Sequence, residues 1–328
     1  MPRKILIIRF SSIGDIVLTS PVVRCLRKQE GDVTIHYLTK EAFASIPESN
    51  PNIDKVYTIR KHVSEVLSDL RAEKYDYIVD LHKNLRSFQV ILGLMRPHGS
   101  FEKLNFKKWL LVRFKTDRMP REHIVDRYLK AAESIGLVND HEGLDFFIPE
   151  GQEVDAGKLP VPFNRDFIGF VIGGKHNTKI LPLDKIIEIC LALKMPVILL
   201  GGKEDTQRGE LIASIPGLEV YNACGKYNLM QSASLVRQAL AIITHDTGLM
   251  HIAAAFRKPI VSVWGNTVPE LGMYPYLPDQ IPQLVAEVKG LDCRPCSKIG
   301  FGQCPKGHFN CMRNQDAGAI AGFVNSLS

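Results

Sequence analysis

The first 81 residues alternate short runs rich in Ile and Val with longer segments of helical periodicity. A short apolar run bounded by polar loops predicts a buried strand, and the segments between such runs predict helices. The expected strands are residues 4–10, 33–39, 55–59 and 77–81, and the expected helices are residues 14–28 and 63–73. Strands and helices that alternate in this order predict a doubly wound parallel sheet.

The same alternation starts again in the second half of the chain, with strands expected at 167–172, 196–200, 218–222, 240–244 and 259–264. Between the halves, residues 84–135 read as mostly helical with scattered bases, and Pro and Gly residues between Pro149 and Pro162 interrupt regular structure. We therefore predict an α/β protein of two Rossmann-like domains, residues 1–155 and 164–328, joined by a linker at 156–163. The C-terminal helix could pack back on the first domain.

Composition supports two folded domains and limits the class of partner. With 328 residues, 45% of them hydrophobic and 23% charged, the chain exceeds one ordinary core and lacks the signature of disorder. Its net charge of +6 favours an anionic partner without naming one. No apolar run approaches the roughly 20 residues that span a bilayer, and the first ten residues lack the features of a signal peptide. We expect a cytoplasmic protein that touches a membrane at most from its surface.

The loop after the first expected strand is the first candidate for chemistry. Open parallel sheets bind ligands beyond the carboxyl ends of their strands, and here Arg9-Phe10-Ser11-Ser12-Ile13-Gly14-Asp15 leads into a helix. Ser12 or Asp15 can simply cap that helix, because the helix dipole stabilises a carboxylate in the first turn. Alternatively, Asp15 projects toward a substrate and takes the proton of an attacking hydroxyl as a general base. Both interpretations stay open at this point.

Two loops of the second half have the composition of a diphosphate site. Gly173-Gly174-Lys175-His176-Asn177-Thr178-Lys179 follows a strand, and it supplies N–H donors, a hydroxyl and positive charge. Thr244-His245-Asp246-Thr247-Gly248-Leu249-Met250-His251 follows another strand, and the helix that Gly248 opens can bind a phosphate at its N-terminus. For the first loop the alternative is an ordinary surface turn, because lysine-bearing turns are common on any surface. For the second loop, His251 can equally be a structural, partly buried histidine.

A nicotinamide-dependent oxidoreductase is the first rival for a Rossmann-like chain, and its fingerprint is missing. Only Gly14 follows the first strand, where a dinucleotide site needs G-x-G-x-x-G, and the second strand ends without an acid to hold a ribose. A G-x-x-x-x-G-K-[ST] loop is missing too. The phosphate-like features lie chiefly in the second half, which fits a donor held there and an acceptor held in the first half.

Taken together, these residues resemble glycosyltransferase family 9, the heptosyltransferases of lipopolysaccharide core synthesis. The similarity is carried by Ile7-Ile8-Arg9-Phe10-Ser11-Ser12-Ile13-Gly14-Asp15-Ile16-Val17-Leu18-Thr19-Ser20-Pro21 and by His245-Asp246-Thr247-Gly248-Leu249-Met250-His251-Ile252-Ala253-Ala254-Ala255. It implies a GT-B fold, whose two parallel sheets face an interdomain cleft, with the acceptor in the N-terminal domain and the donor in the C-terminal domain. It also implies that heptose passes from ADP-heptose to a lipopolysaccharide core or lipid A-type acceptor, with inversion and without a catalytic metal or other cofactor.

Carried onto this sequence, the resemblance assigns roles to individual residues. Asp15 would be the catalytic base, with Ser12 and Gly14 beside the acceptor. Lys179 and the helix that begins at Gly248 would stabilise the departing diphosphate. The remaining donor-binding residues would be Gly174, Lys175, Thr178, Asp246, Thr247, Leu249 and His251.

Two other functions stay open. Members of the family act on different sugars, so one alternative is a related transferase that uses another nucleotide sugar. The second is a sugar-nucleotide or lipid-binding protein that has kept the fold and lost turnover, although a binding module has no need of a base at Asp15.

A basic segment between residues 96 and 130 is the expected surface for the acceptor or for the inner membrane. Its bases outnumber its acids and are interleaved with aromatic and aliphatic residues, which suits a phosphorylated lipid or an anionic membrane. A solvated helix face is the alternative, because lysine is usually exposed. Nucleic acid is not expected, since no recognition helix, RNA-binding aromatic motif or zinc-finger spacing accompanies the bases. The acceptor residues assigned here are Lys107, Lys108, Arg113 and Arg121.

The seven cysteines, without a secretion signal, argue against a disulfide framework. Four of them gather near the end of the chain, with His308 among them. Thiolates and imidazole at such spacings can hold a structural zinc ion, whereas reduced structural thiols and redox chemistry are the alternatives. The candidate metal ligands are Cys293, Cys296, Cys304 and Cys311.

Overall fold

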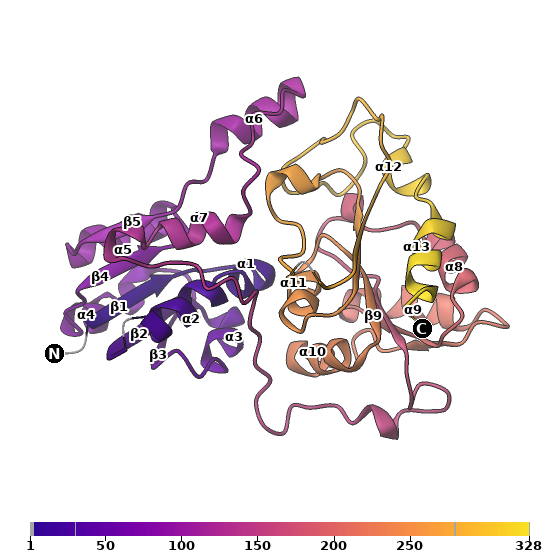
Figure 1. Ribbon diagram of the computed structural model, residues 1–328, viewed down its shortest axis with the longest axis horizontal. Helices are drawn as coiled ribbons and strands as arrows, with labels where there is room; N and C mark the ends of the chain where they lie inside the picture. The colour runs from indigo at the N-terminus through magenta and orange to yellow at the C-terminus, as the bar shows by residue number, and fades with distance from the viewer. Residues whose placement is uncertain (1–2, 30, 279, 328) are drawn as a thin grey trace. The chain divides into compact units, whose positions relative to one another are not determined.

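The computed structural model describes residues 3–29, 31–278 and 280–327, which divide into two compact units (Figure 1). The first unit contains the residues up to Lys103 together with Glu122–Phe147, and the second contains Leu104–Arg121 and the chain from Ile148 onward. Each unit is built on one sheet whose strands all run parallel. The predicted α/β class with two parallel sheets is therefore confirmed, and the cleft between the sheets stays a prediction.

In the first unit, β1 (Arg3–Ile8) is the central strand. It pairs with β2 (Val33–Lys40) on one side and with β4 (Tyr77–Asp80) on the other, while β3 (Lys55–Ile59) and β5 (His98–Ser100) form the edges. The chain adds β2 and β3 outward from β1 and then returns to the other side of β1 to add β4. The point at which the strand order reverses therefore lies between the carboxyl ends of β1 and β4, where open sheets bind ligands.

Helices cover both faces of this first sheet. Leu6 and Ile8 of β1 share a core with α4 (Leu67–Ala72) and α5 (Leu85–Leu94). Ile5 and Ile7 are also completely buried, and they point to the opposite face because side chains alternate along a strand. On that face, α2 contacts both β2 and α7. The bounds of these and the shorter helices are α1 (Ile13–Val17), α2 (Ser20–Gln29), α3 (Ser45–Glu48), α7 (Ile124–Lys130), η1 (Glu41–Phe43), η2 (Val63–Glu65) and η3 (Glu133–Ile135).

The helix expected over residues 14–28 is in fact two helices, α1 and α2. Pro21 explains the break, because it has no N–H to give and its ring clashes with the carbonyl of Val17 in a continuous helix. The hydroxyl of Thr19, between the two helices, donates to the carbonyl of Ile16 at 2.7 Å. The strand at 98–100 was not predicted, since His98-Gly99-Ser100 has no apolar run to reveal it.

The second unit repeats the doubly wound plan with six strands in the order β11-β10-β9-β6-β7-β8. The chain adds β7 and β8 on one side of β6 and then places β9, β10 and β11 on the other. The reversal point therefore lies between the carboxyl ends of β6 and β9. The bounds are β6 (Ile168–Val171), β7 (Val197–Leu200), β8 (Val220–Asn222), β9 (Ala241–His245), β10 (Ile260–Trp264) and β11 (Gln283–Glu287), of which β11 was not expected.

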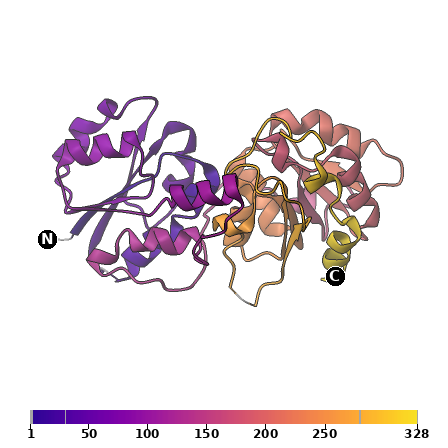
Figure 2. The same ribbon diagram turned by 90° about the horizontal axis from the view of Figure 1, so that it is seen from above.

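The helices of the second unit also form two layers. Ile186 of α8, Ile212 of α9 and Ile320 of α13 share one core with the sheet, whereas α10 and α11 contact each other. Within the second unit, the C-terminal helix α13 thus packs beside α8 (Figures 1 and 2), and a contact between this helix and the first domain stays a prediction. The bounds are α8 (Leu183–Ala192), α9 (Thr206–Ala213), α10 (Leu229–Gln238), α11 (Gly248–Ala255), α12 (Asn310–Arg313), α13 (Ala317–Asn325), η4 (Ala156–Lys158), η5 (Asn177–Lys179), η6 (Lys203–Asp205) and η7 (Pro269–Leu271).

The segment that carries α6 (Asn105–Phe114) belongs to the second unit, although the sequence placed it in a domain of residues 1–155. Leu111 and Met119 of this segment form a small core with Val268 and Leu271. The change of unit at Phe147 also comes earlier than the expected linker. Among all the helices described, none is both long enough and apolar enough to cross a membrane.

Candidate active site

The first constellation lies where the order of strands reverses in the first unit, and it joins Arg9 to Asp15. The Nη2 atom of Arg9 lies 2.7 Å from Oδ1 of Asp15. The same guanidinium donates from Nε to the carbonyl of Ser11 at 2.7 Å and from Nη1 to the carbonyl of Leu81 after β4. Arg9 is buried. Its side chain therefore links the ends of β1 and β4 and fixes the position of the Asp15 carboxylate.

The second oxygen of Asp15 caps helix α1, which is one of the two roles that the sequence left open for this residue. Its Oδ2 accepts hydrogen bonds from the backbone N–H of Ser12 at 3.0 Å and from the Ser12 hydroxyl at 2.8 Å. A carboxylate has about four acceptor sites, two on each oxygen. Among the described residues only Arg9 donates to Oδ1, so one acceptor site on Oδ1 is free. The side chain is 21% exposed. Asp15 can therefore both cap α1 and accept a proton at Oδ1.

Electrostatics keep Asp15 ionised. Burial by itself would raise the pKa of this carboxyl, but the charge of Arg9 and the hydrogen bonds from Ser12 outweigh it, so the pKa of Asp15 lies below its ordinary value. An ionised carboxylate at neutral pH is the form that a general base requires.

His82, which the sequence did not single out, also lies near Asp15. Its ring packs edge-on against Phe10, with the ring centroids 5.2 Å apart. Burial first, then the positive charges of Arg9 and Lys103, lower the pKa of His82 to about 3, so its ring is neutral. Its Nδ1 atom is buried and has no hydrogen-bond partner in the part of the chain described. The only signal in the sequence was its place just after a strand.

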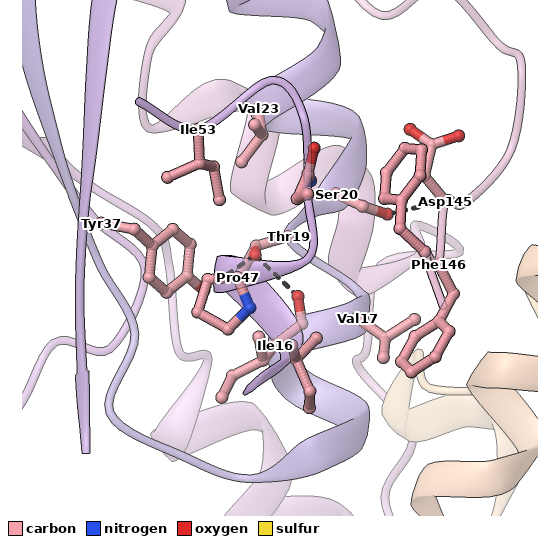
Figure 3. Close-up of a pocket in the computed structure, with 13 residues that line it drawn as sticks. Ile16, Val17, Thr19, Ser20, Val23, Tyr37, Pro47, Ile53, Asp145 and Phe146 are labelled. Atoms are coloured by element: carbon pink, nitrogen blue, oxygen red, sulfur yellow. Dashed lines mark hydrogen bonds between the residues drawn. The ribbon is translucent and has the colours of Figure 1, made fainter. Parts of the chain in front are cut away.

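A small cavity lies between α1, α2 and α3, which contributes Pro47 (Figure 3). Thr19 and Tyr37 line it and share a hydrogen bond of 2.9 Å, and Phe146 lies on the other side. Its volume of about 20 Å³ holds one water molecule. The cavity is therefore too small to take a sugar acceptor.

In the second unit, the structure joins Lys179 and Asp246, two residues of the predicted donor loops. The ammonium of Lys179 lies 2.6 Å from Oδ2 of Asp246, which also accepts the hydroxyl of Thr267 at 3.0 Å. Thr267, which was not predicted, follows β10, so the loops after three strands meet here. The carboxylate of Asp246 holds the lysine ammonium in place and leaves it further donors for an anion.

Contacts between the two donor loops are close. Gly174 lies beside Thr247, since a Cβ atom on the glycine would be in ordinary van der Waals contact with the Thr247 side chain at 3.4 Å. The backbone N–H of Leu181 donates to Nε2 of His245 at 3.0 Å. His245 is completely buried, and burial lowers its pKa to about 3, so this neutral histidine holds the loops together. Gly248 and Leu249, both half-buried, open α11 beside them.

The remaining predicted donor residues have different surroundings. Lys175 is exposed and His251 is buried within α11. Thr178 is buried, and its hydroxyl donates to the carbonyl of Phe301 at 3.0 Å and accepts from the N–H of Phe301 at 2.8 Å. These bonds commit Thr178 to anchoring the 301 loop, a use that the sequence did not predict.

The basic residues assigned to the acceptor lie in the second unit, whereas Ser12, Gly14 and Asp15 lie in the first. Lys107 and Arg113 of α6 are exposed and Lys108 is half-buried. Arg121, also exposed, forms an ion pair with Asp117 at 3.1 Å. Among these bases the structure shows exposed aromatic residues, in which Trp109 stacks on Phe106 and meets Phe114 edge-on.

The cysteine cluster does not have the arrangement of a metal site. Cys293 Sγ lies 3.8 Å from Nε2 of His308, and the Cys296 thiol donates to the carbonyl of Cys293 at 3.1 Å. No three His, Cys, Asp or Glu side chains of the described residues are placed to hold a metal ion. Burial also raises the pKa of Cys296 and of Cys311 to about 11, so both thiols are protonated at neutral pH in the metal-free protein. The four cysteines, Cys304 included, are free thiols that do not fit the predicted zinc site as they stand.

A model of the family described as "Glycosyltransferase family 9 (heptosyltransferase)" matches residues 63–296, more than two thirds of the chain. The chain belongs to glycosyltransferase family 9. This family 9 glycosyltransferase is 24% identical to lipopolysaccharide heptosyltransferase 1 of Campylobacter coli, over 80% of this chain and 84% of that one. The predicted family and enzyme class are thereby confirmed.

Solved structures agree on the fold of this family 9 glycosyltransferase. A family 9 glycosyl transferase of Veillonella parvula is similar with a TM-score of 0.79 and 22% identity, over 99% of this chain and 97% of that chain. The ADP-heptose lps heptosyltransferase II of E. coli is similar with a TM-score of 0.73 and 21% identity, over 99% and 98%. The GT-B class expected for the two parallel sheets is confirmed.

Proposed function

We propose that this family 9 glycosyltransferase transfers heptose from ADP-heptose to a hydroxyl of a lipopolysaccharide core or lipid A-type acceptor, with inversion. The observation that carries the proposal is the Arg9–Asp15 pair at the reversal point of the first sheet. A fixed, ionised carboxylate there supplies the base, and the Lys179–Asp246 pair at the second reversal point supplies a site for the diphosphate. The names of its relatives, which are heptosyltransferases of lipopolysaccharide, support the sugar and the acceptor.

Lys179 and α11 hold the donor in this proposal. The Lys179 ammonium has three protons, of which two point to the carboxylate and the backbone carbonyl of Asp246, at 2.6 and 3.4 Å, and the third can bind a diphosphate oxygen. The N-terminus of α11, at Gly248, adds unpaired N–H groups and the positive end of the helix dipole. Gly174 and Thr247 let the backbone of both loops approach the diphosphate. These groups oppose the charge that builds up as the sugar leaves, which takes the place of a metal ion.

Asp15 acts on the acceptor. Its Oδ1 accepts the proton of the acceptor hydroxyl, whose oxygen attacks the anomeric carbon of heptose from the side opposite the diphosphate. A new C–O bond forms, the bond to the diphosphate breaks, and ADP departs with the electron pair. Attack from the opposite side inverts the anomeric configuration.

Arg9 is a positioning residue for this base. It holds Oδ1 by an ion pair while two carbonyls hold the guanidinium, so the carboxylate cannot rotate away from its place beside Ser12. Ser12 and Gly14 border the acceptor hydroxyl in this arrangement. A base held in one orientation before the substrate arrives loses little entropy during reaction.

The bases of α6 bind the anionic part of the acceptor in the proposal. Lys107, Lys108 and Arg113, with Arg121 beyond the helix, supply positive charge, and the aromatic cluster of Trp109 suits the interface of a bilayer. The enzyme then works at the cytoplasmic face of the inner membrane as a peripheral protein. No nucleic acid takes part.

The test of the proposed function is transfer by the purified protein from ADP-heptose to truncated core acceptors, followed by mass spectrometry. We expect Asp15→Ala and Asp15→Asn to lower kcat by about 10²–10⁴-fold, the usual contribution of a general base. Binding of ADP-heptose, measured by calorimetry, should stay unchanged, because the donor residues are intact. Transfer by Asp15→Ala at the wild-type rate would refute the role of the base, and transfer only from another nucleotide sugar would refute the donor.

Charge reversal on α6 tests the acceptor surface. Changing Lys107, Lys108 and Arg113 to Glu should raise the acceptor KM by about tenfold or more, since each base near an anionic surface is worth about 1 kcal/mol. The KM for ADP-heptose should not change. Charge reversal at Lys158, which is equally exposed but lies in another part of the second unit, is the control. An unchanged acceptor KM in the triple variant would exclude this surface.

A further inference from the structure

The outward side of α5 carries a continuous apolar stripe. Leu85, Phe88 and Leu92 are spaced by three and four residues, so they follow one side of α5 over about 10 Å, and Met95 comes directly after the end of the helix. Their exposed fractions are 74%, 53%, 58% and 86%. The opposite side of α5 is buried in the core of the first unit through Val90, Ile91 and Leu94. The stripe is therefore additional to the apolar face that the fold uses.

Exposed apolar residues on α8 and α9 of the second unit differ in arrangement. α8 has Leu191 and α9 has Leu211, and each is the one large apolar side chain exposed on its helix. Isolated exposures of this kind are normal on a protein surface. Three in register on α5, with Met95 directly after them, form a patch, and patches mark surfaces that bind a partner or a membrane.

Positive charge surrounds the stripe. Residues 81–101 contain no Asp or Glu, whereas Lys83, Arg86 and Arg96 precede, accompany and follow the stripe. Lys83 and Arg96 are exposed, and Arg86 is half-buried. The neighbouring elements η2 and α4 add two exposed acids, Glu65 and Asp69, and one exposed base, Arg71, so the bases around α5 still outnumber the acids. The rim of the stripe is therefore cationic.

We propose that the outward face of α5 docks on an anionic lipid bilayer, with the stripe of Leu85, Phe88, Leu92 and Met95 in the interface and Lys83 and Arg96 on the lipid headgroups. An apolar stripe with a basic rim is the composition of a helix that lies in the plane of a membrane surface. A second copy of this chain fits less well, because two basic rims would repel each other.

The position of α5 relates this surface to the chemistry. α5 begins at Leu85, shortly after the end of β4, and Leu81 at that end accepts the hydrogen bond from Arg9. Within the first unit, the stripe thus starts near the edge of the sheet that holds Asp15. A bilayer on α5 would present the headgroup of a lipid-linked acceptor at that edge. This link to the acceptor rests on the proposed function, whereas membrane docking by α5 does not.

Binding of the full chain to vesicles tests the inference. Vesicles of phosphatidylcholine with about 30% phosphatidylglycerol are compared with pure phosphatidylcholine, since an anionic surface should gain about fivefold in binding for each Lys or Arg near it. The variant with Phe88→Ser and Leu92→Ser should bind the anionic vesicles at least tenfold more weakly. Its side chains are exposed, so folding should be kept. The matched control carries Leu191→Ser and Leu211→Ser and should bind as the wild type does.

The charge of the rim is tested separately. Lys83→Glu with Arg96→Glu should remove most of the preference for anionic over neutral vesicles. Transfer to a soluble, acyl-free acceptor should stay unchanged in every α5 variant, whereas transfer to an acceptor embedded in vesicles should fall. If the wild-type protein does not transfer heptose to the soluble acceptor, the result counts against the proposed function. Vesicle binding by α5 is then still tested as an independent result.

Three results would overturn the inference. The first is vesicle binding by the Phe88 and Leu92 variant at the wild-type level. The second is loss of binding by Trp109→Ser alone, with the α5 variant unaffected, which would assign the membrane surface to α6. The third is a change in self-association with no change in vesicle binding, which would make the stripe a contact between copies of the chain.

Discussion

Replacing Arg9 by Gln should move the acidic limb of the activity profile to higher pH. The guanidinium of Arg9 lies 2.7 Å from the Asp15 carboxylate. Two charges centred about 4 Å apart interact by about 4 kcal/mol at an effective dielectric constant of 20, and one pKa unit corresponds to about 1.4 kcal/mol. This sets an upper limit of about three pH units on the movement of the acidic limb, and the movement is upward because the charge of Arg9 lowers the pKa of Asp15.

The sign follows from the form of the base. Asp15 works when ionised, so activity falls as the pH drops through its pKa, and a higher pKa moves that fall to higher pH. The other titratable groups near Asp15 do not interfere. In the wild type the pKa of His82 is about 3, chiefly because of burial, which Arg9→Gln leaves in place, although loss of the Arg9 charge moves this pKa upward as well. Burial raises the pKa of Tyr37 and of Tyr128 well above their ordinary values. A shifted acidic limb therefore reports on the carboxylate.

The assay is kcat/KM for a soluble acceptor as a function of pH, for the wild type, Arg9→Gln and Arg9→Lys. Arg9→Lys keeps the charge, so its acidic limb should stay near that of the wild type even if its rate falls. Arg24→Gln is the matched control, because Arg24 is another buried arginine of the first unit, paired with Asp140 and Asp145. Both Gln variants should lose about 3–5 kcal/mol of stability, which is the usual cost of breaking a buried pair.

The reasoning would be refuted by either of two results. The first is an acidic limb for Arg9→Gln that coincides with the wild type, while Asp15→Ala is inactive and Arg9→Gln is folded by circular dichroism. The second is an equal shift in Arg24→Gln, which would attribute the change to lost stability instead of to the charge beside Asp15.

Three further predictions concern other parts of the chain. Lys179→Met should lower kcat by about 10²–10³-fold through loss of charge stabilisation, whereas Lys185→Met on α8 should not, and steady-state kinetics decides between them. Glu73, whose pKa is lowered to about 2 by hydrogen bonds from Lys4 and Tyr57, stabilises the fold above its ordinary pKa of 4.5 and loses that effect as the pH falls toward 2. Glu73→Gln should therefore lower Tm at neutral pH and flatten its decline in acid, and a parallel decline would contradict this. Metal analysis of the purified protein should find less than about 0.2 zinc per chain, since the thiols near Cys296 are not placed as ligands, and one zinc per chain would revive the predicted site.

The local sequence pattern was sufficient to predict most strands of this protein and the loops that carry its candidate site residues. The short apolar runs of the strands and the polar loops after them are properties of neighbouring residues, so nine of the strands and the loops of Asp15, Lys179 and Asp246 could be predicted without coordinates. Residues 98–100 and 283–287, the two strands that were missed, lie at sheet edges, where one is short and the other only half-buried.

Tertiary structure alone decided which of these loops meet. The order of parallel strands depends on crossovers that no local pattern records, and it is this order that brings the carbonyl of Leu81 to Arg9 and Asp246 to Lys179. Thr178 had the composition of a phosphate ligand, yet it is bonded to Phe301, a residue 123 positions away. The α5 stripe likewise could not be distinguished by sequence from a core face, because an apolar period shows that residues share a side of a helix and not whether another element covers it.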